Sequence, residues 1–229
     1  SCICRTPARY NIWMVIERPF IDGCAAAHAL SLVGERWALL VVRELALGPR
    51  RFTDLRVGLP NVSPNVLAQR LRDLEEVGVV QKRKLPPPAA SQVYELTEWG
   101  YGLEPVLISL GHWAVRSPFL PRNGTLGVNS LILSFRTMFN PDAAKGLKAS
   151  YELRLGEETF YARVANNQFE IARGEISKAT VKVETSTDTL TALVYGGYHL
   201  NEAIRSGEVK LEGDKKMLER FLKLFPLPN

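Results

Sequence analysis

The stretch from residue 63 to residue 78, SPNVLAQRLRDLEEVG, constrains the fold more than any other part of this chain. Its leucines recur at i, i+4 and i+7, the spacing of one helical face, and they are Leu67, Leu71 and Leu74. Ser63 stands at the N-cap position, Pro64 follows in the first turn, where its missing N–H costs nothing, and Gly78 closes the other end. We therefore expect an amphipathic helix over this stretch.

The opposite face of this helix is polar. It carries Asn65, Val66, Gln69 and Asp73, flanked by Arg70 and Arg72. Amide side chains are suited to reading base edges, and guanidinium groups are suited to holding phosphates. The stretch is therefore predicted to be a DNA-recognition helix.

Shorter elements surround this helix in the order of a winged helix. After a short first helix we expect a second over Glu35–Leu47 and a third over Phe52–Val57, with Thr53 as the N-cap of the third. Beyond residue 78 come two β-prone runs, Val79–Lys84 and Gln92–Thr97, joined by LPPPAAS. Because proline cannot continue a strand ladder, this link is expected to form the tip of a hairpin. A helix-turn-helix followed directly by a hairpin is a winged helix.

The residues expected to contact DNA fall into two groups. Asn65, Gln69 and Arg70 are expected at the recognition surface, and the other basic residues are expected mainly on phosphates. The full expected set is Arg50, Arg51, Ser63, Asn65, Gln69, Arg70, Arg72, Lys82, Arg83 and Lys84. For the run from Lys82 to Lys84, a solvated strand face is the alternative interpretation.

A further helix is expected from its cap at Thr97 to about Arg116. Its apolar stripe consists of Leu103, Val106, Leu107, Leu110 and Ala114. Because this helix follows a complete small domain, the stripe needs a partner, either on its own domain or on a second copy of the chain. A twofold protein matched to a palindromic operator favours a homodimer.

Several motifs in this region occur together. They are Cys24 before the first helix, G-E-R-W at 34–37, R-R-F-x-D-L at 50–55, S-P-x-x-L-x-x-R-L from residue 63, and Y-x-L-T-x-x-G at 94–100. With them, residues 18–118 closely resemble the HxlR-type winged helix-turn-helix transcriptional regulators. The resemblance implies dimeric binding to palindromic DNA by repressors or activators that respond to small molecules or oxidants. Members often carry an Arg after the wing prolines, where this chain has Ala89, Ala90 and Ser91, so the resemblance does not extend to a minor-groove contact from the wing tip.

Cys24 is a candidate redox site. In some relatives of this family the matching Cys senses oxidants, and His28, one helical turn further on, could lower the pKa of the thiol. The alternative is a small core residue. Cys2 and Cys4 lack both the spacing and the partner ligands of a structural zinc site, so no metal is expected.

The stretch 117–127, SPFLPRNGTLG, breaks every periodicity and is expected to link two domains. Beyond a helix near residues 131–139, apolar and polar residues alternate over four strands between residues 149 and 183, with turns at Gly156-Glu157 and Asn166-Asn167. Two short helices, a strand and a closing helix are expected over 187–195, 200–205, 209–212 and 214–225. This pattern predicts a largely antiparallel sheet whose one apolar face is covered by helices.

The last part of the chain carries a second resemblance. Gly196-Gly197 after a Leu-rich helix, A-x-x-S-G-x-V-K-x-x-G-D at 203–214 and a final amphipathic helix make residues 128–225 similar to the sterol carrier protein type two domain. The resemblance implies an apolar tunnel for lipids or other hydrophobic ligands. The expected lining is Phe135, Phe139, Tyr151, Phe160, Phe169 and Leu193. The alternative is that these residues simply fill a core.

Composition sets the remaining bounds. The 229 residues are 46% hydrophobic and 23% charged, typical of a soluble globular protein, and the net charge of +5 permits nucleic-acid binding without demanding it. No apolar run approaches the roughly 18 residues of a membrane span, and no signal peptide is recognisable, so we expect a cytoplasmic protein without membrane insertion. Neither a catalytic nor a cofactor motif is found, so we expect no enzyme and no cofactor.

These observations predict an α+β protein with an N-terminal extension over 1–20, a winged helix-turn-helix domain over 21–117, a linker over 118–127 and a sterol-carrier-like domain over 128–229. Its predicted function is that of a dimeric transcriptional regulator, which binds a palindromic operator in double-stranded DNA through the 63–78 helix and the wing. The C-terminal domain is expected to bind a hydrophobic small molecule as effector. Two alternatives stay open: a lipid-binding or lipid-transfer protein whose winged helix serves only for dimerisation, and a thiol-based redox-sensing regulator acting through Cys24.

Overall fold

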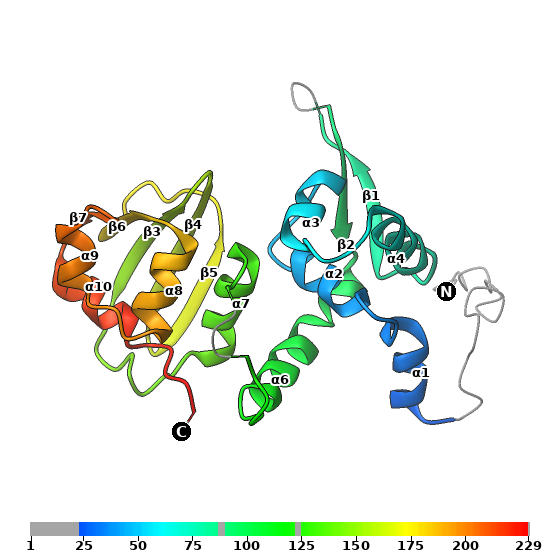
Figure 1. Cartoon of the computed structure of the whole chain (residues 1–229), viewed down its shortest axis with the longest axis horizontal. Coiled ribbons are helices and arrows are strands. Elements are labelled where there is room, and N and C mark those ends of the chain that lie inside the picture. Colours follow the sequence, from blue (N-terminus) through cyan, green and yellow to red (C-terminus); the bar gives the residue numbers. More distant parts are fainter. Residues whose placement is uncertain (1–22, 87–89, 122–124, 229) are drawn as a thin grey trace, which may run out of the picture. The chain divides into compact units, whose positions relative to one another are not determined.

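The structure, a computed structural model, describes residues 23–86, 90–121 and 125–228. Contacts between residues divide the chain into two compact units, Ser1–Glu104 and Pro105–Asn229 (Figure 1). The division falls inside the helix that was expected to run from Thr97 to Arg116. The expected extension over 1–20, with Cys2 and Cys4, lies outside the described residues.

The first unit is a winged helix, as the sequence predicts. Its elements are α1 (Ala25–Val33), α2 (Ala38–Leu45), α3 (Phe52–Gly58), α4 (Pro64–Glu76), β1 (Val80–Lys84), β2 (Gln92–Leu96) and α5 (Glu98–Tyr101). Strands β1 and β2 pair antiparallel with Val80 opposite Leu96, and the hairpin projects beyond the helices of its unit (Figure 1). The core beneath α4 consists of fully buried aliphatic side chains, among them Val41, Leu45, Leu55, Leu67, Leu71 and Leu74.

Two helix starts differ from the sequence-based expectation. Helix α2 begins at Ala38 rather than Glu35, because the backbone of Trp37 is left-handed, with φ +78°, and leaves the helical path. Thr53 is not the N-cap of α3, so that prediction was wrong. Arg51 occupies the cap position, and its N–H donates to the Asp54 carboxylate at 3.0 Å. The acidic side chain reaching back from the first turn therefore fixes the start of α3.

The long helix expected after the wing is broken into two. Thr97 does cap the first piece, α5, since its hydroxyl accepts a hydrogen bond from Gly100 N at 3.0 Å. The second piece is α6 (Glu104–Ala114), and Pro105 stands in its first turn. Pro105 has no N–H to donate to the carbonyl of Tyr101, four residues earlier, and its ring crowds that carbonyl, which disfavours a continuous helix across this point.

The second unit consists of one sheet and the helices that cover it. Its elements after α6 are α7 (Val128–Met138), β3 (Ala149–Leu155), β4 (Glu158–Ala165), β5 (Gln168–Arg173), β6 (Val181–Thr185), α8 (Thr187–Tyr195), α9 (Leu200–Arg205), β7 (Val209–Gly213) and α10 (Lys215–Leu222). The strand order is β5-β4-β3-β6-β7, and β3–β6 is the single parallel pair of this sheet, so the sheet is largely antiparallel as expected. The two-residue turn at Asn166-Asn167 has φ +53° and +58°, which matches the twist of the flanking strands.

One face of this sheet is buried and the other is polar. On the buried face, Tyr151 is fully buried and donates its hydroxyl to the carbonyl of Met217 in α10 at 3.1 Å. On the other face, cross-strand ion pairs such as Lys210–Glu184 at 2.6 Å lie in solvent. This arrangement confirms the predicted one-sided sheet, because an antiparallel sheet can leave one face to water.

Candidate nucleic-acid interface

Helix α4 presents the face that the sequence assigns to DNA. Ser63 caps it through a hydrogen bond from Val66 N to its hydroxyl at 3.3 Å, and its three leucines are buried. On the outer side, Asn65, Gln69 and Arg72 are exposed to solvent within this unit. The predicted division between a core face and an outer face is thus present in the structure.

The polar residues of α4 are linked to one another. The Gln69 Nε2 group donates to Asp73 Oδ1 at 2.6 Å, and Arg72 Nη2 donates to Gln69 Oε1 at 2.5 Å. These are the i, i+4 and i, i+3 spacings at which helical side chains meet. Both polar atoms of the Gln69 amide, the nitrogen and the oxygen, are therefore hydrogen-bonded.

Arg70 does not lie on the exposed face. Its side chain is 18% exposed and forms ion pairs with Glu35 at 3.3 Å and with Asp73 at 3.2 Å. The helical spacing placed Arg70 at the edge of the recognition surface, but in the structure its guanidinium group is paired with Glu35, an exposed carboxylate of the segment before α2. Sequence reasoning missed Glu35 in this role because the contact joins two elements that only the fold brings together.

The wing separates residues that are adjacent in sequence. Successive strand residues point to opposite faces, so Lys82 and Lys84 share one face while Arg83 lies on the other. Lys82 donates to Glu75 of α4 at 2.5 Å and lies over the Tyr94 ring, and its hydrogen bond with Glu75 raises the pKa of the ammonium group. Arg83 pairs with Glu95 at 2.8 Å. The predicted basic run is solvent-exposed on both faces, and two of its three cations already have carboxylate partners.

The turn before α3 is joined to the wing through its backbone. Arg50 and Tyr94 exchange hydrogen bonds, Arg50 N to Tyr94 O at 2.9 Å and Tyr94 N to Arg50 O at 2.8 Å. Arg51, the next residue, is exposed. The pairing places two predicted phosphate-binding residues at the edge of the hairpin, a proximity that the sequence spacing does not reveal.

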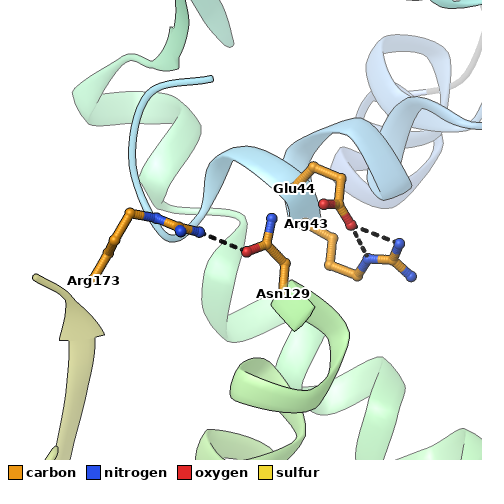
Figure 2. Close-up of polar contacts among 4 residues, drawn as sticks. All are labelled: Arg43, Glu44, Asn129 and Arg173. Carbon is orange, nitrogen blue, oxygen red and sulfur yellow. Dashed lines mark hydrogen bonds and ion pairs between the residues drawn. The ribbon is translucent and has the colours of Figure 1, made fainter. Parts of the chain in front are cut away.

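Glu44 of α2 is a buried carboxylate that faces the end of α3. Glu44 is 4% exposed and accepts two hydrogen bonds from Arg43, at 3.1 and 2.7 Å (Figure 2). Its other oxygen lies so close to Gly58 that a Cβ there would stand 2.3 Å away. A side chain at Gly58, the last residue of α3, would therefore force the Glu44 carboxylate to move.

The expected ligand-lining residues of the second unit lie mostly in its core. Phe135, Tyr151 and Phe160 are fully buried, and burial raises the pKa of Tyr151 to about 12. The rings of Phe139 and Phe169 stack at 5.2 Å. The structure therefore brings these aromatic residues together as packing rather than around a void.

A groove of about 490 Å³ lies elsewhere in this unit, between α8, α9 and α10, and Leu193 is the one expected lining residue that borders it. Its other lining residues include Val194, Leu200, Leu222, Phe225 and Pro226, with Tyr198, His199 and Lys223 among the polar ones.

Beside the sheet, Asn129 is 2% exposed and accepts a hydrogen bond from Arg173 at 2.8 Å (Figure 2). Arg173 also pairs with Glu158 and lies 4.7 Å from the centre of the Phe160 ring. The hydrogen bond between Arg173 and Asn129 joins α7 to the sheet, and the Arg173–Glu158 ion pair joins the neighbouring strands β5 and β4, so both are part of the fold.

Cys24 is exposed at the N-cap position of α1. Hydrogen bonds from the backbone N–H groups of Ala27 and Ala26 lower the pKa of its thiol. The sequence analysis named His28 as the group that could lower the pKa of the thiol. In the structure, the backbone N–H groups of the first turn of α1 stabilise the thiolate instead.

No group of three or more His, Cys, Asp or Glu side chains in residues 23–86, 90–121 and 125–228 could hold a metal ion. Within the same ranges no single helix is long and apolar enough to cross a membrane. Helices α1 and α2 reach that length and apolar composition only when taken together, and the pair is bent by 79°.

Comparison with known families matches each part of the chain separately. Residues 32–118 match the family described as HxlR-like helix-turn-helix, and residues 126–229 match the family described as alkyl sulfatase C-terminal. The chain is 37% identical over 86 residues to the uncharacterized HTH-type transcriptional regulator YvaP of Bacillus subtilis, covering 38% of this chain and 80% of that protein. It is also 37% identical over 86 residues to the HTH-type transcriptional regulator YodB of Bacillus subtilis, covering 38% of this chain and 77% of that protein.

Two solved structures are similar to separate parts of the chain. The reduced form of YodB from Bacillus subtilis is 33% identical, with a TM-score of 0.39, and the match covers 44% of this chain and 99% of that chain. The inverting sec-alkylsulfatase Pisa1 from Pseudomonas sp. is 24% identical, also with a TM-score of 0.39, and the match covers 44% of this chain. The chain spans 16% of the length of that sulfatase. The sterol-carrier resemblance of the second unit remains a prediction.

Proposed function

Because the chain belongs to the HxlR-like helix-turn-helix family through residues 32–118, we propose that it is a cytoplasmic, dimeric transcriptional regulator. Its α4 helix enters the major groove of a palindromic operator, and its wing contacts the backbone beside that groove. The observation that carries the proposal is the exposed polar face of α4, on which Asn65, Gln69 and Arg72 lie outward over a buried leucine face.

The proposed contacts divide by chemistry. Asn65 and Gln69 have the amide groups that pair with base edges, and the capped N-terminus at Ser63 directs its backbone N–H groups toward a phosphate. The cations expected on phosphates are Arg50, Arg51, Arg72, Lys82, Arg83 and Lys84. Arg70 supports this surface from within, through its two ion pairs.

Dimerisation is proposed through α6. No residue of this helix is buried, and Val106, Leu110 and Trp113 are 46%, 43% and 76% exposed. An apolar helix face of this kind is typical of a surface that a partner covers. In a twofold dimer the two α4 helices must reach successive major grooves, about 34 Å apart.

The second unit is proposed to bind a hydrophobic small molecule as effector, in the groove bordered by Leu193. Occupancy would change the separation of the two α4 helices and so the fit to both half-sites. Mass spectrometry of an organic-solvent extract of the purified protein tests this proposal. Absence of any hydrophobic ligand, together with no thermal stabilisation by long-chain amphiphiles, would remove the effector proposal without affecting DNA binding.

The DNA proposal is tested with duplexes that the protein itself selects from a random pool. Gln69→Ala should relax base preference at one position and cost roughly 1–3 kcal/mol, whereas Arg51→Ala should weaken binding to all sequences and flatten the slope of log K against log salt by about 1. Arg205→Ala, the same charge change on an exposed residue of the second unit, is the control. Unchanged binding in both interface variants, or no enrichment of any sequence by the wild type, would refute the assignment.

A redox-sensing regulator is the second candidate, favoured by the exposed Cys24 thiol and its lowered pKa. The relative YodB has been solved in reduced and quinone-bound forms. If Cys24 is the sensor, peroxide or quinone should change operator binding of the wild type and leave a Cys24→Ser variant unaffected. An equal response of both proteins would rule this candidate out.

A further inference from the structure

A continuous chain of polar contacts runs from the segment before α2 to the outer face of α4. Glu35 pairs with Arg70 at 3.3 Å, and Arg70 pairs with Asp73 Oδ2 at 3.2 Å. The other oxygen of Asp73 accepts from Gln69 Nε2 at 2.6 Å, and Gln69 Oε1 accepts from Arg72 at 2.5 Å. Asp73 is thus held on both oxygens, and Gln69 on both polar atoms.

The chemistry of these neighbours fixes which way the Gln69 amide points. A guanidinium group only donates hydrogen bonds, so the atom facing Arg72 must be the carbonyl oxygen. A carboxylate only accepts, so the atom facing Asp73 must be the amide nitrogen. Turning the amide over would place donor against donor and acceptor against acceptor, so one orientation is selected.

The amide still has unused hydrogen-bonding capacity on its exposed side. Of its two N–H groups one is taken by Asp73, and of its two carbonyl lone pairs one is taken by Arg72. One donor on Nε2 and one acceptor on Oε1 remain. In the major groove this pair complements the N7 acceptor and N6 amino donor of adenine, whereas guanine presents two acceptors.

We propose that Gln69 reads an adenine and that Asp73 and Arg72 are positioning residues that orient its amide for this reading. Arg70 anchors Asp73 from the protein side. The proposal rests on the proposed DNA-binding function and adds the base recognised and the residues that set its specificity.

The test uses the full chain and duplexes derived from the sequence that the wild type selects. At the base pair where Gln69→Ala loses discrimination, the wild type should prefer A·T by about 5- to 150-fold over the other pairs. Asp73→Ala should reduce this preference several-fold, and Asp73→Glu, which keeps an acceptor at i+4, should retain most of it. The double variant Gln69→Ala, Asp73→Ala should show the same base preference at this position as Gln69→Ala alone, because Asp73 acts only through Gln69.

Glu76→Ala is the matched control. Glu76 is an exposed acidic residue of the same helix, with no ion pair in the described part of the chain, so its removal should raise affinity for all duplexes alike and leave base preference intact. Circular dichroism and melting should be the same for Asp73→Ala and Glu76→Ala. Asp73→Ser, whose hydroxyl is too short to reach the amide, replaces Asp73→Ala if the latter melts early.

The outcomes separate this inference from the proposed function. If the wild type selects no sequence, the DNA-binding proposal fails. If it selects a sequence but the position sensitive to Gln69→Ala is not A·T, or if the Asp73 variants discriminate as well as Glu76→Ala, the role given to Gln69 and Asp73 is wrong while DNA binding stands.

Discussion

Gly100 lies against the base of the wing, where no side chain fits. A Cβ built on it would stand 2.1 Å from the carbonyl oxygen of Val79 and 3.3 Å from the Cβ of Leu96. Gly100→Ala should therefore lower the free energy of unfolding by about 1–3 kcal/mol, the usual cost of overpacking, or by more because the obstacle is backbone. Urea unfolding measures the loss. In Gly127→Ala the new methyl would meet nothing nearer than 3.9 Å, so a similar loss there would contradict the steric explanation.

Cys24 gives a residue-scale prediction that depends on pH. Because backbone N–H groups stabilise the thiolate, the pKa of the folded thiol lies below that of the unfolded chain. As pH rises, the thiolate is thus populated earlier in the folded protein, and alkylation of Cys24 by iodoacetamide should reach its half-maximal rate at a lower pH than in urea. Peptide mass spectrometry, which separates Cys24 from Cys2 and Cys4, measures the rate. Equal midpoints in the two conditions would show that the N-cap geometry does not act on the thiol.

At the scale of elements, the apolar stripe of α6 is exposed within the described part of the chain. If α6 forms the dimer interface, Leu110→Glu should raise the dissociation constant of the dimer by at least about tenfold, because an unpaired buried carboxylate costs more than about 1.4 kcal/mol. Sedimentation over a concentration series measures this. Ser109→Glu, one residue away and also exposed, should have little effect, and equal effects of the two variants would place the interface elsewhere.

The elements also differ in how far the sequence predicts them. Helix α4 and the strands of the second unit follow from periodicity and end signals, because Ser63, Gly78 and Asn166-Asn167 act through local geometry. The start of α2 depends on a left-handed Trp37, which nothing in its local pattern indicates. The break before α6 could have been predicted from Pro105, whose missing N–H is a local property.

At the scale of the whole molecule, each unit has a core of its own. In the second unit Phe221 is fully buried and contacts several rings, among them Tyr151 at 4.6 Å and Phe225 at 5.2 Å. Phe221→Ala should lower the free energy of unfolding of this unit by about 3–5 kcal/mol. Hydrogen exchange should then become faster in β3 and β4 and stay unchanged in α4 and β1. Lys216→Ala, on the exposed side of the same helix, is the control, and faster exchange in both units would show that they unfold together.

The outward-facing residues of the candidate site could be predicted from the sequence, but the ion pairs between its elements could not. Helical spacing identifies Asn65, Gln69 and Arg72 as outward residues, and each of them is exposed. The inward position of Arg70 and the Glu75–Lys82 pair involve residues of different elements, so no local pattern contains them. Of the residues expected to line a pocket, Phe135, Tyr151 and Phe160 are fully buried, and alternation identifies such an inward face without determining how tightly it is filled.

The sequence by itself determined the recognition helix, the hairpin and the one-sided sheet, because caps, periods and turn residues act over a few residues and need no distant partner. Only the tertiary structure decided which polar groups of different elements pair with one another. It brought Glu35 to Arg70 and Lys82 to Glu75, whereas the contacts of Asp73 with Arg70 and Gln69 follow the i, i+3 and i, i+4 spacings within α4. The physical reason is that a hydrogen bond depends on the distance and direction between two atoms, and for residues on different elements only the packing of the whole unit sets both.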